Sequence, residues 1–298
     1  MLSFEPKDKP VPELFGLMLD AIGPRPIAFA STIDENGHPN LSPFSFFNAF
    51  GANPPIIVFS PARRGRDNTN KHTFYNVKSI PEVVINIVNY AMVQQVNLAS
   101  TEYEKGVNEF EKAGFTQVKS DLIRPYRVKE SPVQMECKVL NVIETGTEGS
   151  AGNLVICEVL KFHYQEEILN EKGHVDPDKI DLVGRMGRDY YVRASGSAVF
   201  KLGKPGAYPG VGIDLLPESI KFSKILTGND LGLLGGVEKL PESAEIDNFV
   251  RSTPFYKALI SLEPGSEKFI TEKHQLAKKY IETNRVEEAL KILLFAES

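Results

Sequence analysis

The chain has little cysteine. Its 298 residues include only Cys137 and Cys157, and no C-x-x-C spacing joins them. Two cysteines are too few for a disulfide framework of the kind that supports small secreted domains. Both lie in apolar, strand-like runs, so we interpret them as small buried hydrophobic residues. A redox pair is the less favoured alternative, because the spacing does not support one.

The chain also has no excess of positive charge and no long apolar run. Lysine and arginine total 34 against 39 aspartate and glutamate residues, for a formal net charge of −5. This balance argues against nucleic-acid binding through bulk charge, although a local basic patch can still bind an anion. No apolar run approaches the roughly 20 residues that span a bilayer, and no secretory signal is visible at the N-terminus. We therefore expect a cytoplasmic protein with no membrane or nucleic-acid partner.

Motifs for metals and for activated nucleophiles are missing as well. Four of the five histidines, His38, His163, His174 and His274, have no partner at metal-ligand spacing. No nucleophile elbow and no phosphate-cradling Walker loop is present. The sequence predicts no metal site, and it leaves the catalytic residues unassigned.

The pattern of what is present predicts a mainly β protein with a helical end. β-branched and aromatic runs separated by turn residues predict an antiparallel sheet with helical insertions. Its six main strands are expected at 26–33, 39–47, 56–60, 82–89, 131–144 and 153–167, with helices at 70–79 and 91–113. Closing such a sheet into a barrel removes its exposed edges. The composition changes after the glycine- and proline-rich stretch 201–212, so we expect one domain over 1–204 and a helical C-terminal extension over 205–298.

Polar residues interrupt the apolar strands near the N-terminus. The stretch "NLSPFSFFNAFGANPPIIVFSP" carries hydroxyls and amides between Phe, Ile and Val, with a proline inside the strand. The candidate ligand-binding residues here are Ser31, Thr32, Asn40, Ser42, Pro43, Ser45, Phe46, Asn48 and Ser60. Such groups can bond the polar edge of a planar heterocycle and its ribityl chain. The alternative is that they face water on one side of a half-buried sheet.

A basic loop follows directly and runs into the start of a helix. The stretch "RRGRDNTNKHT" gathers arginines with Lys71, His72 and Thr73, and Thr69 or Asn70 is the expected N-cap of the helix. Helix N-termini and cationic side chains both suit a phosphate. A solvated basic loop is the slightly favoured explanation when this segment is considered alone. Beside the polar strands, however, it favours a phosphorylated planar cofactor.

A second basic and aromatic stretch lies at "GRMGRDYY", residues 184–191. Tyr190 could stack on a planar cofactor or cover its face, and Arg188 could meet the phosphate of a dinucleotide or a partner subunit. Interface packing is the equally weighted alternative for both. The stretch is not a dinucleotide fingerprint, because no strand–turn–helix unit surrounds it.

Five segments in order resemble one known family. "PRPIAFASTIDENGHPNLSPFSFFNAFGANPPIIVFSP", "NKHTFYNV", "EFEKAGF", "ESPVQMEC" and "GRMGRDYY" are similar to the flavin reductase-like, FMN-binding split-barrel proteins, which include flavoredoxin. The resemblance covers roughly residues 15–200. It implies an antiparallel split β-barrel, FMN held non-covalently, and a homodimer with the flavin near the subunit seam. It also assigns the flavin lining to Thr32, Asn40, Ser42, Ser45, Phe46 and Ser60, and the phosphate to Lys71 and Thr73.

One position departs from that family pattern. The helix start usually reads Lys-Asp-Thr in the family, but here it reads Lys71-His72-Thr73. An acidic residue is thus replaced by one that is neutral or cationic near physiological pH. If this side chain only caps the helix, His72 is a weaker cap than aspartate. If it faces the phosphate, His72 adds a hydrogen bond to it.

The resemblance implies an FMN-dependent oxidoreductase that takes hydride from NAD(P)H and passes electrons to an unknown acceptor. No protein acid or base is required for hydride transfer to a flavin, which agrees with the missing catalytic motifs. The alternatives are a flavoredoxin-like electron carrier reduced by a partner protein, and a binder of a pyridoxal-type phosphate. The C-terminal extension is expected to cover the flavin, add dimer contacts or recruit a partner.

Overall fold

The computed structural model describes residues 1–204 and 209–295. Contacts divide the chain into two compact units, Met1–Phe200 and Lys201–Ser298, which we name the N-terminal unit and the C-terminal unit. Each unit is described by itself. The expected domain boundary at residues 204 and 205 lies at the edge of the described residues, because 205–208 are outside them.

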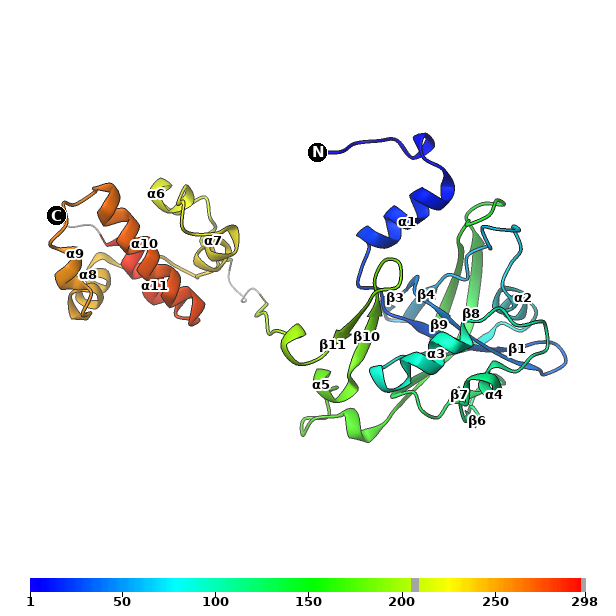
Figure 1. The fold of residues 1–298 in the computed structure, drawn as a ribbon. Coiled ribbons are helices and arrows are strands. Elements are labelled where there is room, and N and C mark those ends of the chain that lie inside the picture. The colour runs from blue at the N-terminus through cyan, green and yellow to red at the C-terminus, as the bar shows by residue number, and fades with distance from the viewer. Residues whose placement is uncertain (205–208, 296–298) are drawn as a thin grey trace. The chain divides into compact units, whose positions relative to one another are not determined.

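The N-terminal unit is built on one antiparallel sheet of seven strands (Figure 1). The strand order is β2-β1-β5-β8-β9-β4-β3, so β2 and β3 are the two edges. The bounds are β1 (Ala28–Ile33), β2 (Pro39–Phe44), β3 (Phe47–Ala52), β4 (Pro55–Phe59), β5 (Glu82–Ile87), β8 (Val133–Glu144) and β9 (Asn153–Tyr164). Two small hairpins complete the strands: β6 (Gln117–Val118) with β7 (Arg127–Val128), and β10 (Leu182–Arg185) with β11 (Tyr191–Ala194).

The expected strand over 39–47 is in fact two strands on opposite edges of the sheet. β2 pairs with β1, whereas β3 pairs with β4, and the chain turns between them at Ser45 and Phe46. Pro43 explains part of this break, because proline lacks the N–H needed for a second ladder and is confined to edge strands. The prediction that these residues form strands was correct, but the prediction of one continuous strand was wrong. The break opens the barrel at this point.

Helices cover the sheet of the N-terminal unit. The longer ones are α1 (Val11–Ala21), α2 (His72–Ser79), α3 (Val93–Ala99) and α4 (Glu109–Ala113). The remaining pieces are η1 (Pro6–Asp8), η2 (Tyr90–Met92), η3 (Glu166–Ile168), α5 (Pro177–Ile180) and η4 (Gly196–Ala198). The expected helix over 91–113 is thus divided into η2, α3 and α4. The N-cap of α2 is Lys71 rather than Thr69 or Asn70.

Strand alternation sends side chains of β1 into two separate cores. Ala28 and Ala30 pack with Phe44 and Phe59 inside the barrel. Phe29, from the opposite face of the same strand, packs under α3 and α4. This arrangement follows from the period of two along a strand. It fixes β1 and β2 between the barrel core and the helical layer.

The two cysteines lie in the barrel core. Cys137 of β8 and Cys157 of β9 are fully buried and make no disulfide. Burial raises the pKa of the Cys157 thiol to about 12, and that of Cys137 rises in the same direction for the same reason. Both therefore remain protonated at neutral pH, as expected for small buried hydrophobic residues.

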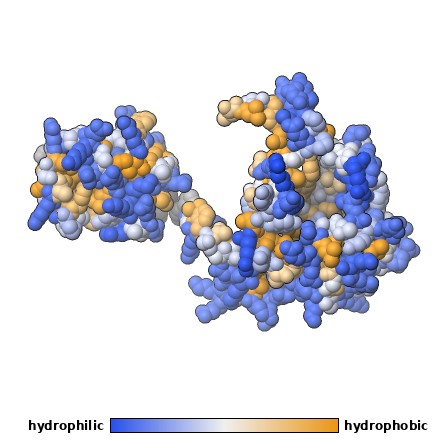
Figure 2. All heavy atoms as spheres, viewed as in Figure 1, coloured by the Kyte–Doolittle hydropathy of each residue, from blue (hydrophilic) through white to orange (hydrophobic). Residues whose placement is uncertain are grey.

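The C-terminal unit is helical among its described residues. Its helices are α6 (Glu218–Lys221), α7 (Gly228–Gly235), α8 (Ser243–Ser252), α9 (Tyr256–Leu259), α10 (Glu267–Glu282) and α11 (Val286–Leu294). They enclose a hydrophobic core of their own, with Val250, Leu259, Ala277 and Leu290 at its centre. The amphipathic pattern predicted this helical character. The surface of both units that faces the viewer in Figure 2 is largely hydrophilic, with apolar residues exposed in small patches.

Within the described ranges, 1–204 and 209–295, no helix has the length and apolar character that crossing a bilayer requires. The cytoplasmic location stays a prediction of the sequence.

Candidate functional site: a cleft at the break in the barrel

A cleft of about 620 Å³ lies where β2 ends and the chain turns toward β3. One wall is the segment Ser42–Phe46, and Ser60 follows at the end of β4. The basic loop over 62–66 and Lys71 form the opposite side, and α1 contributes Phe15 and Leu19. The volume lies in the range of about 300–1,000 Å³ that small-molecule sites occupy.

The cleft brings together six of the sequence-predicted residues. These are Ser42, Pro43, Ser45, Phe46, Ser60 and Lys71. A smaller pocket adjoins it, because Ser42 and Lys71 line both, and adds Asn40, His72 and Thr73. The polar strand residues and the basic helix start are therefore neighbours in space, as the sequence analysis expected.

Thr32 has a structural role beside this site. Its Oγ1 accepts hydrogen bonds from Asn40 Nδ2 at 3.2 Å and from Asn76 Nδ2 at 3.0 Å. Asn40 Nδ2 also donates to Thr73 Oγ1 at 3.0 Å. All four side chains are buried, so these bonds satisfy groups that would otherwise be costly to bury. The network holds β1 and β2 against α2, and thereby positions the first turn of that helix.

Two predicted residues lie away from the cleft. The Ser31 side chain is fully buried on the other face of β1, and its Oγ has no hydrogen-bond partner among the described residues. Asn48 is exposed on β3, where its Oδ1 accepts from the Ala49 amide at 2.8 Å. Neither lines the cleft or the adjoining pocket.

Arg188 and Tyr190 lie at the turn of the β10–β11 hairpin and do not line the cleft. Tyr190 is 72% exposed, and the Arg188 guanidinium lies 3.5 Å from the carboxylate of Asp20 in α1. The same motif instead places Arg185 in the cleft wall. Its guanidinium lies 4.6 Å from the ring centroid of Tyr191, which faces a smaller hollow beside Pro43 and Ser45.

The basic side of the cleft is an ordered cluster of cations. Arg64 donates to Glu102 at 2.9 Å and to the Asn70 carbonyl at 2.5 Å, and Lys71 donates to Glu102 at 2.8 Å. Arg66 also pairs with Glu102. The hydrogen bond from Lys71 and then that from Arg64 hold the pKa of Glu102 at about 2, against the effect of burial. Glu102 is therefore ionised at every physiological pH.

The cation cluster still fits a phosphate. Arg63, Arg64, Arg66 and Lys71 face two carboxylates, Asp67 and Glu102, which leaves a net charge of +2. Phosphate monoesters carry about −1.5 to −2 charges at neutral pH. The charge, the hydroxyls of Ser42 and Ser60, and the volume of the cleft all match a planar group with a phosphorylated tail.

His72 occupies the first helical position of α2, and its ring is partly buried. It is not the cap, because Lys71 takes that position. Burial lowers the pKa of His72, and the nearby charges of Arg64, Lys105 and Lys71 lower it further. The ring is therefore neutral at pH 7 and can serve a ligand as a hydrogen-bond donor or acceptor.

Several residues of the cleft carried no signal in the sequence. Arg25 is buried and donates to the carbonyls of Leu19 and Met186 at 2.7 and 2.8 Å, which ties α1 to the β10–β11 hairpin. It also lies 3.4 Å from Ser45 Oγ. In the sequence, the only signal that Arg25 lines the cleft is its position just before the polar strand. Glu102 lies in the loop between α3 and α4, inside the stretch 91–113 that the sequence predicted to be helical, so its contact with the basic loop was not expected.

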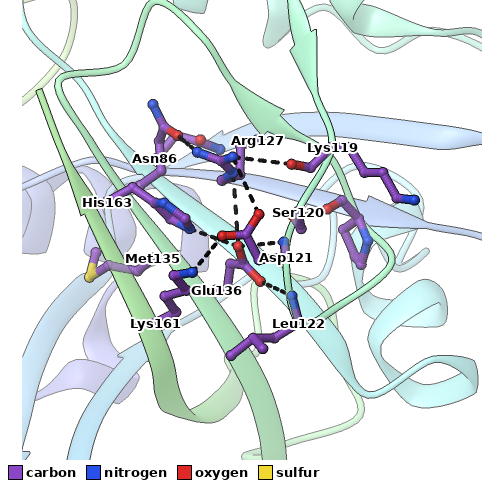
Figure 3. A network of polar contacts seen from close by, with 12 residues as sticks. Asn86, Lys119, Ser120, Asp121, Leu122, Arg127, Met135, Glu136, Lys161 and His163 are labelled. Atoms are coloured by element: carbon purple, nitrogen blue, oxygen red, sulfur yellow. Dashed lines mark hydrogen bonds and ion pairs between the residues drawn. The ribbon is translucent and has the colours of Figure 1, made fainter.

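Among the residues that the structure describes, one His/Asp/Glu group is close enough to hold a metal ion: Asp121, Glu136 and His163, whose ligand atoms lie within 4.8 Å of one another. Their oxygens already have partners (Figure 3). Glu136 accepts from the amides of Asp121 and Leu122 at 2.9 and 2.7 Å and lies 2.7 Å from His163 Nε2. Lys161 Nζ lies 2.5 Å from Asp121. We interpret the group as an ion network that fastens the loop after β6 to β8 and β9.

The fold and the cleft define a split barrel with a cation-lined cleft at its opening. The family model for the flavin reductase like domain matches residues 22–178 of the chain. An uncharacterised protein of Aquifex aeolicus is 34% identical over 201 residues, which are 67% of this chain and 100% of that protein. The chain therefore belongs to the flavin reductase-like family.

Two solved structures agree with this assignment. Nitrilotriacetate monooxygenase component B from Bacillus cereus is 31% identical, with a TM-score of 0.63 over 68% of this chain and 98% of that chain. A flavin reductase-like protein with a split barrel domain from Shewanella frigidimarina is 25% identical, with a TM-score of 0.58 over 68% and 100%. The resemblance and the fold class expected from the sequence are confirmed. The family match ends at residue 178, before the C-terminal unit.

Proposed function

We propose that the protein binds FMN in the cleft and acts as an oxidoreductase that moves electrons from NAD(P)H through the flavin to an acceptor. The observation that carries the proposal is the cation cluster of Arg63, Arg64, Arg66 and Lys71 beside a hydroxyl-lined cleft of about 620 Å³. Family membership supports the flavin. The relative from Bacillus cereus is a component of a monooxygenase, which supports a role in electron supply.

The side chains divide the work of holding FMN. Arg64 and Lys71 would bind the phosphate, because charge-assisted hydrogen bonds to phosphate are the strongest that the cleft offers. Ser42, Ser45 and Ser60 would bond polar atoms of the ring edge and the ribityl chain. Phe46 would contact the ring face. The bound flavin supplies the redox chemistry, and the protein holds it in place and limits the access of water.

A homodimer is part of the proposal. Leu140 of β8 and Leu160, Phe162 and Tyr164 of β9 are apolar or aromatic residues on neighbouring strands, and each is more than 40% exposed. The Phe162 and Tyr164 rings stack with centroids 6.2 Å apart. Exposed apolar residues grouped on neighbouring strands in this way are typical of an interface between copies of a chain. Arg188 and Tyr190, which are free of the cleft in one chain, would then meet the flavin or the other copy.

Mixing FMN-loaded protein with NADH and with NADPH tests the proposed activity. We expect the yellow absorbance of the flavin to bleach with one or both. Bleaching by dithionite alone would contradict the nicotinamide step and would support the flavoredoxin-like carrier. A protein that takes up no FMN would contradict both, and an absorbance typical of pyridoxal phosphate would identify that cofactor instead.

A further inference from the structure

A second cavity, of about 570 Å³, shares Arg64 with the cleft of the candidate site, which we name the flavin cleft after the proposed ligand. It is bounded by the β1–β2 turn, by α2 and by the segment 105–107. Its volume again falls in the range of about 300–1,000 Å³ typical of small-molecule sites. The proposed binding of FMN does not use it.

The second cavity and the flavin cleft have lining residues in common. Arg64 lines both of them. Asn40 and His72 line the second cavity and also the small pocket that includes Ser42 and Lys71. Arg64 of the cation cluster therefore lines both cavities and offers positive charge to each. A ligand with phosphates in its middle can occupy both sides at once.

The lining of the second cavity suits a nucleoside. Tyr75 of α2 is 53% exposed and presents a ring on which a base can stack. Asn70 keeps its side-chain N–H groups as donors for the edge of a base, because among the described residues only its oxygen is engaged, by Asn153. Asn76 keeps its side-chain oxygen as an acceptor, because only its nitrogen is engaged there, by Thr32. Lys105 makes no ion pair within residues 1–204 and 209–295, so its charge is free to meet a phosphate.

We propose that the second cavity binds the adenylate half of a dinucleotide whose other half reaches the flavin cleft. This inference rests on the proposed function. The dinucleotide is either FAD, with its isoalloxazine in the first cleft, or NAD(P)H, with its nicotinamide directed there. Both share the adenosine phosphate that the cavity recognises. Tyr75 stacks on the base, and Arg64, His72 and Lys105 face the phosphates.

The test measures three ligands on the full chain and on its variants. Calorimetry follows 5′-AMP, fluorescence quenching follows FMN and FAD, and steady-state kinetics compare NADH with reduced nicotinamide mononucleotide. Tyr75→Ala is expected to lower the affinity for 5′-AMP about tenfold, because one stacking contact is lost, and to leave the affinity for FMN unchanged. Tyr75→Phe keeps the ring and is expected to keep the affinity. Lys105→Ala is expected to weaken 5′-AMP about threefold, whereas the control Lys172→Ala, at an exposed lysine outside the cavity, is expected to have no effect.

The outcomes separate this inference from the proposed function. A chain that binds 5′-AMP but no FMN retains the cavity and refutes the flavin cleft. A chain that binds FMN but no 5′-AMP, or whose 5′-AMP affinity survives Tyr75→Ala, overturns the inference. If Tyr75→Ala lowers the affinity for FAD and leaves the KM for NADH unchanged, the dinucleotide is FAD. If the variant raises the KM for NADH and leaves the affinity for FAD unchanged, the dinucleotide is the nicotinamide one. If the affinity for 5′-AMP falls while the affinity for FAD and the KM for NADH stay the same, the claim that the two cavities share one ligand is wrong.

Discussion

The two units of the chain use their buried polar groups in opposite ways. In the N-terminal unit, Asn40, Ser60 and Thr73 are buried beside an open cleft and a cluster of cations. In the C-terminal unit, Lys273 of α10 donates to the carbonyls of Leu293 and Phe295 at 3.1 and 2.6 Å. The first set borders a space for a ligand, whereas Lys273 caps the end of the neighbouring helix α11.

This difference indicates where function and stability reside. The polar groups at the cleft bond the chain and also border a space that a ligand can fill, whereas a group that caps a helix bonds the chain alone. His274 follows the second pattern, because its Nδ1 lies 2.8 Å from Ser223 Oγ and its ring is buried. The core of the C-terminal unit shares no residue with the cores of the barrel. We therefore expect flavin affinity to depend on the N-terminal unit and to be insensitive to the capping groups of the other.

The largest effect is expected from removing two cations of the cleft. In the double variant Arg64→Met/Lys71→Met, two charge-assisted hydrogen bonds to the phosphate are lost, and each is worth about 1.5–3 kcal/mol. The dissociation constant for FMN is expected to rise by about 1,000-fold, measured by quenching of flavin fluorescence. Lys257→Met, at an exposed lysine of the C-terminal unit, is the control and is expected to bind FMN normally. Equal affinity in the double variant and the control would place the phosphate elsewhere.

The next effect concerns the C-terminal unit alone. Lys273→Ala leaves two buried carbonyls without their donor and opens a small cavity, at a cost of roughly 2–4 kcal/mol in the free energy of unfolding. Calorimetry is expected to show a lowered transition for this unit, with the FMN affinity of the chain unchanged. A change of tenfold or more in FMN affinity would show that the two units act as one, against the comparison drawn here.

The stability of the C-terminal unit is also expected to depend on pH. Burial lowers the pKa of Lys273 from 10.5 to about 8. Between these values the unfolded chain binds the proton more tightly than the folded chain, so stability increases as pH rises through this window, by roughly 3 kcal/mol in all. Urea unfolding at pH 8 and pH 10 measures the gain. The same experiment on Lys273→Met is expected to show no such gain, and an identical pH dependence in that variant would assign it to other groups.

The smallest effect is expected at Glu102, whose carboxylate competes with a phosphate for Arg64 and Lys71. Glu102→Gln keeps the shape and removes the charge, so FMN should bind up to about fivefold more tightly, the size of a partly exposed ion pair. Because the pKa of Glu102 is about 2 and a phosphate monoester is fully ionised well above its second pKa near 6, the gain is expected to be constant from about pH 7 to pH 9. Weaker binding in the variant would mean that Glu102 orients the cations rather than competing for them.

The sequence predicted which polar and basic residues lie together better than it predicted how the strands connect. Hydroxyls in an apolar strand and cations at a helix start are local signals, so Ser42, Ser60 and Lys71 could be predicted to lie together. The break between β2 and β3 could not, because "PNLSPFSFFNAFGA" satisfies the strand pattern throughout and the turn at Ser45 depends on which neighbour each half pairs with.

Long-range contacts account for the other differences. Glu102 and Arg25 reach the cleft through pairing partners far away in sequence, such as Lys71 and Met186. Tyr190 and Tyr191 are adjacent in a short motif, yet only Tyr191 turns toward the site, because side chains on a hairpin alternate. The position of each tyrosine depended on the register of β10 with β11, which the sequence pattern does not specify.

The central claim is that the cation cluster holds the phosphate of a flavin whose ring lies in the cleft at the break of the barrel. Titrating the protein with FMN and with riboflavin tests it most directly, because the two ligands differ only in the phosphate. We expect FMN to bind at least about 100-fold more tightly than riboflavin, as two charge-assisted hydrogen bonds require. Equal affinity for the two ligands, or no binding of either, would contradict the account.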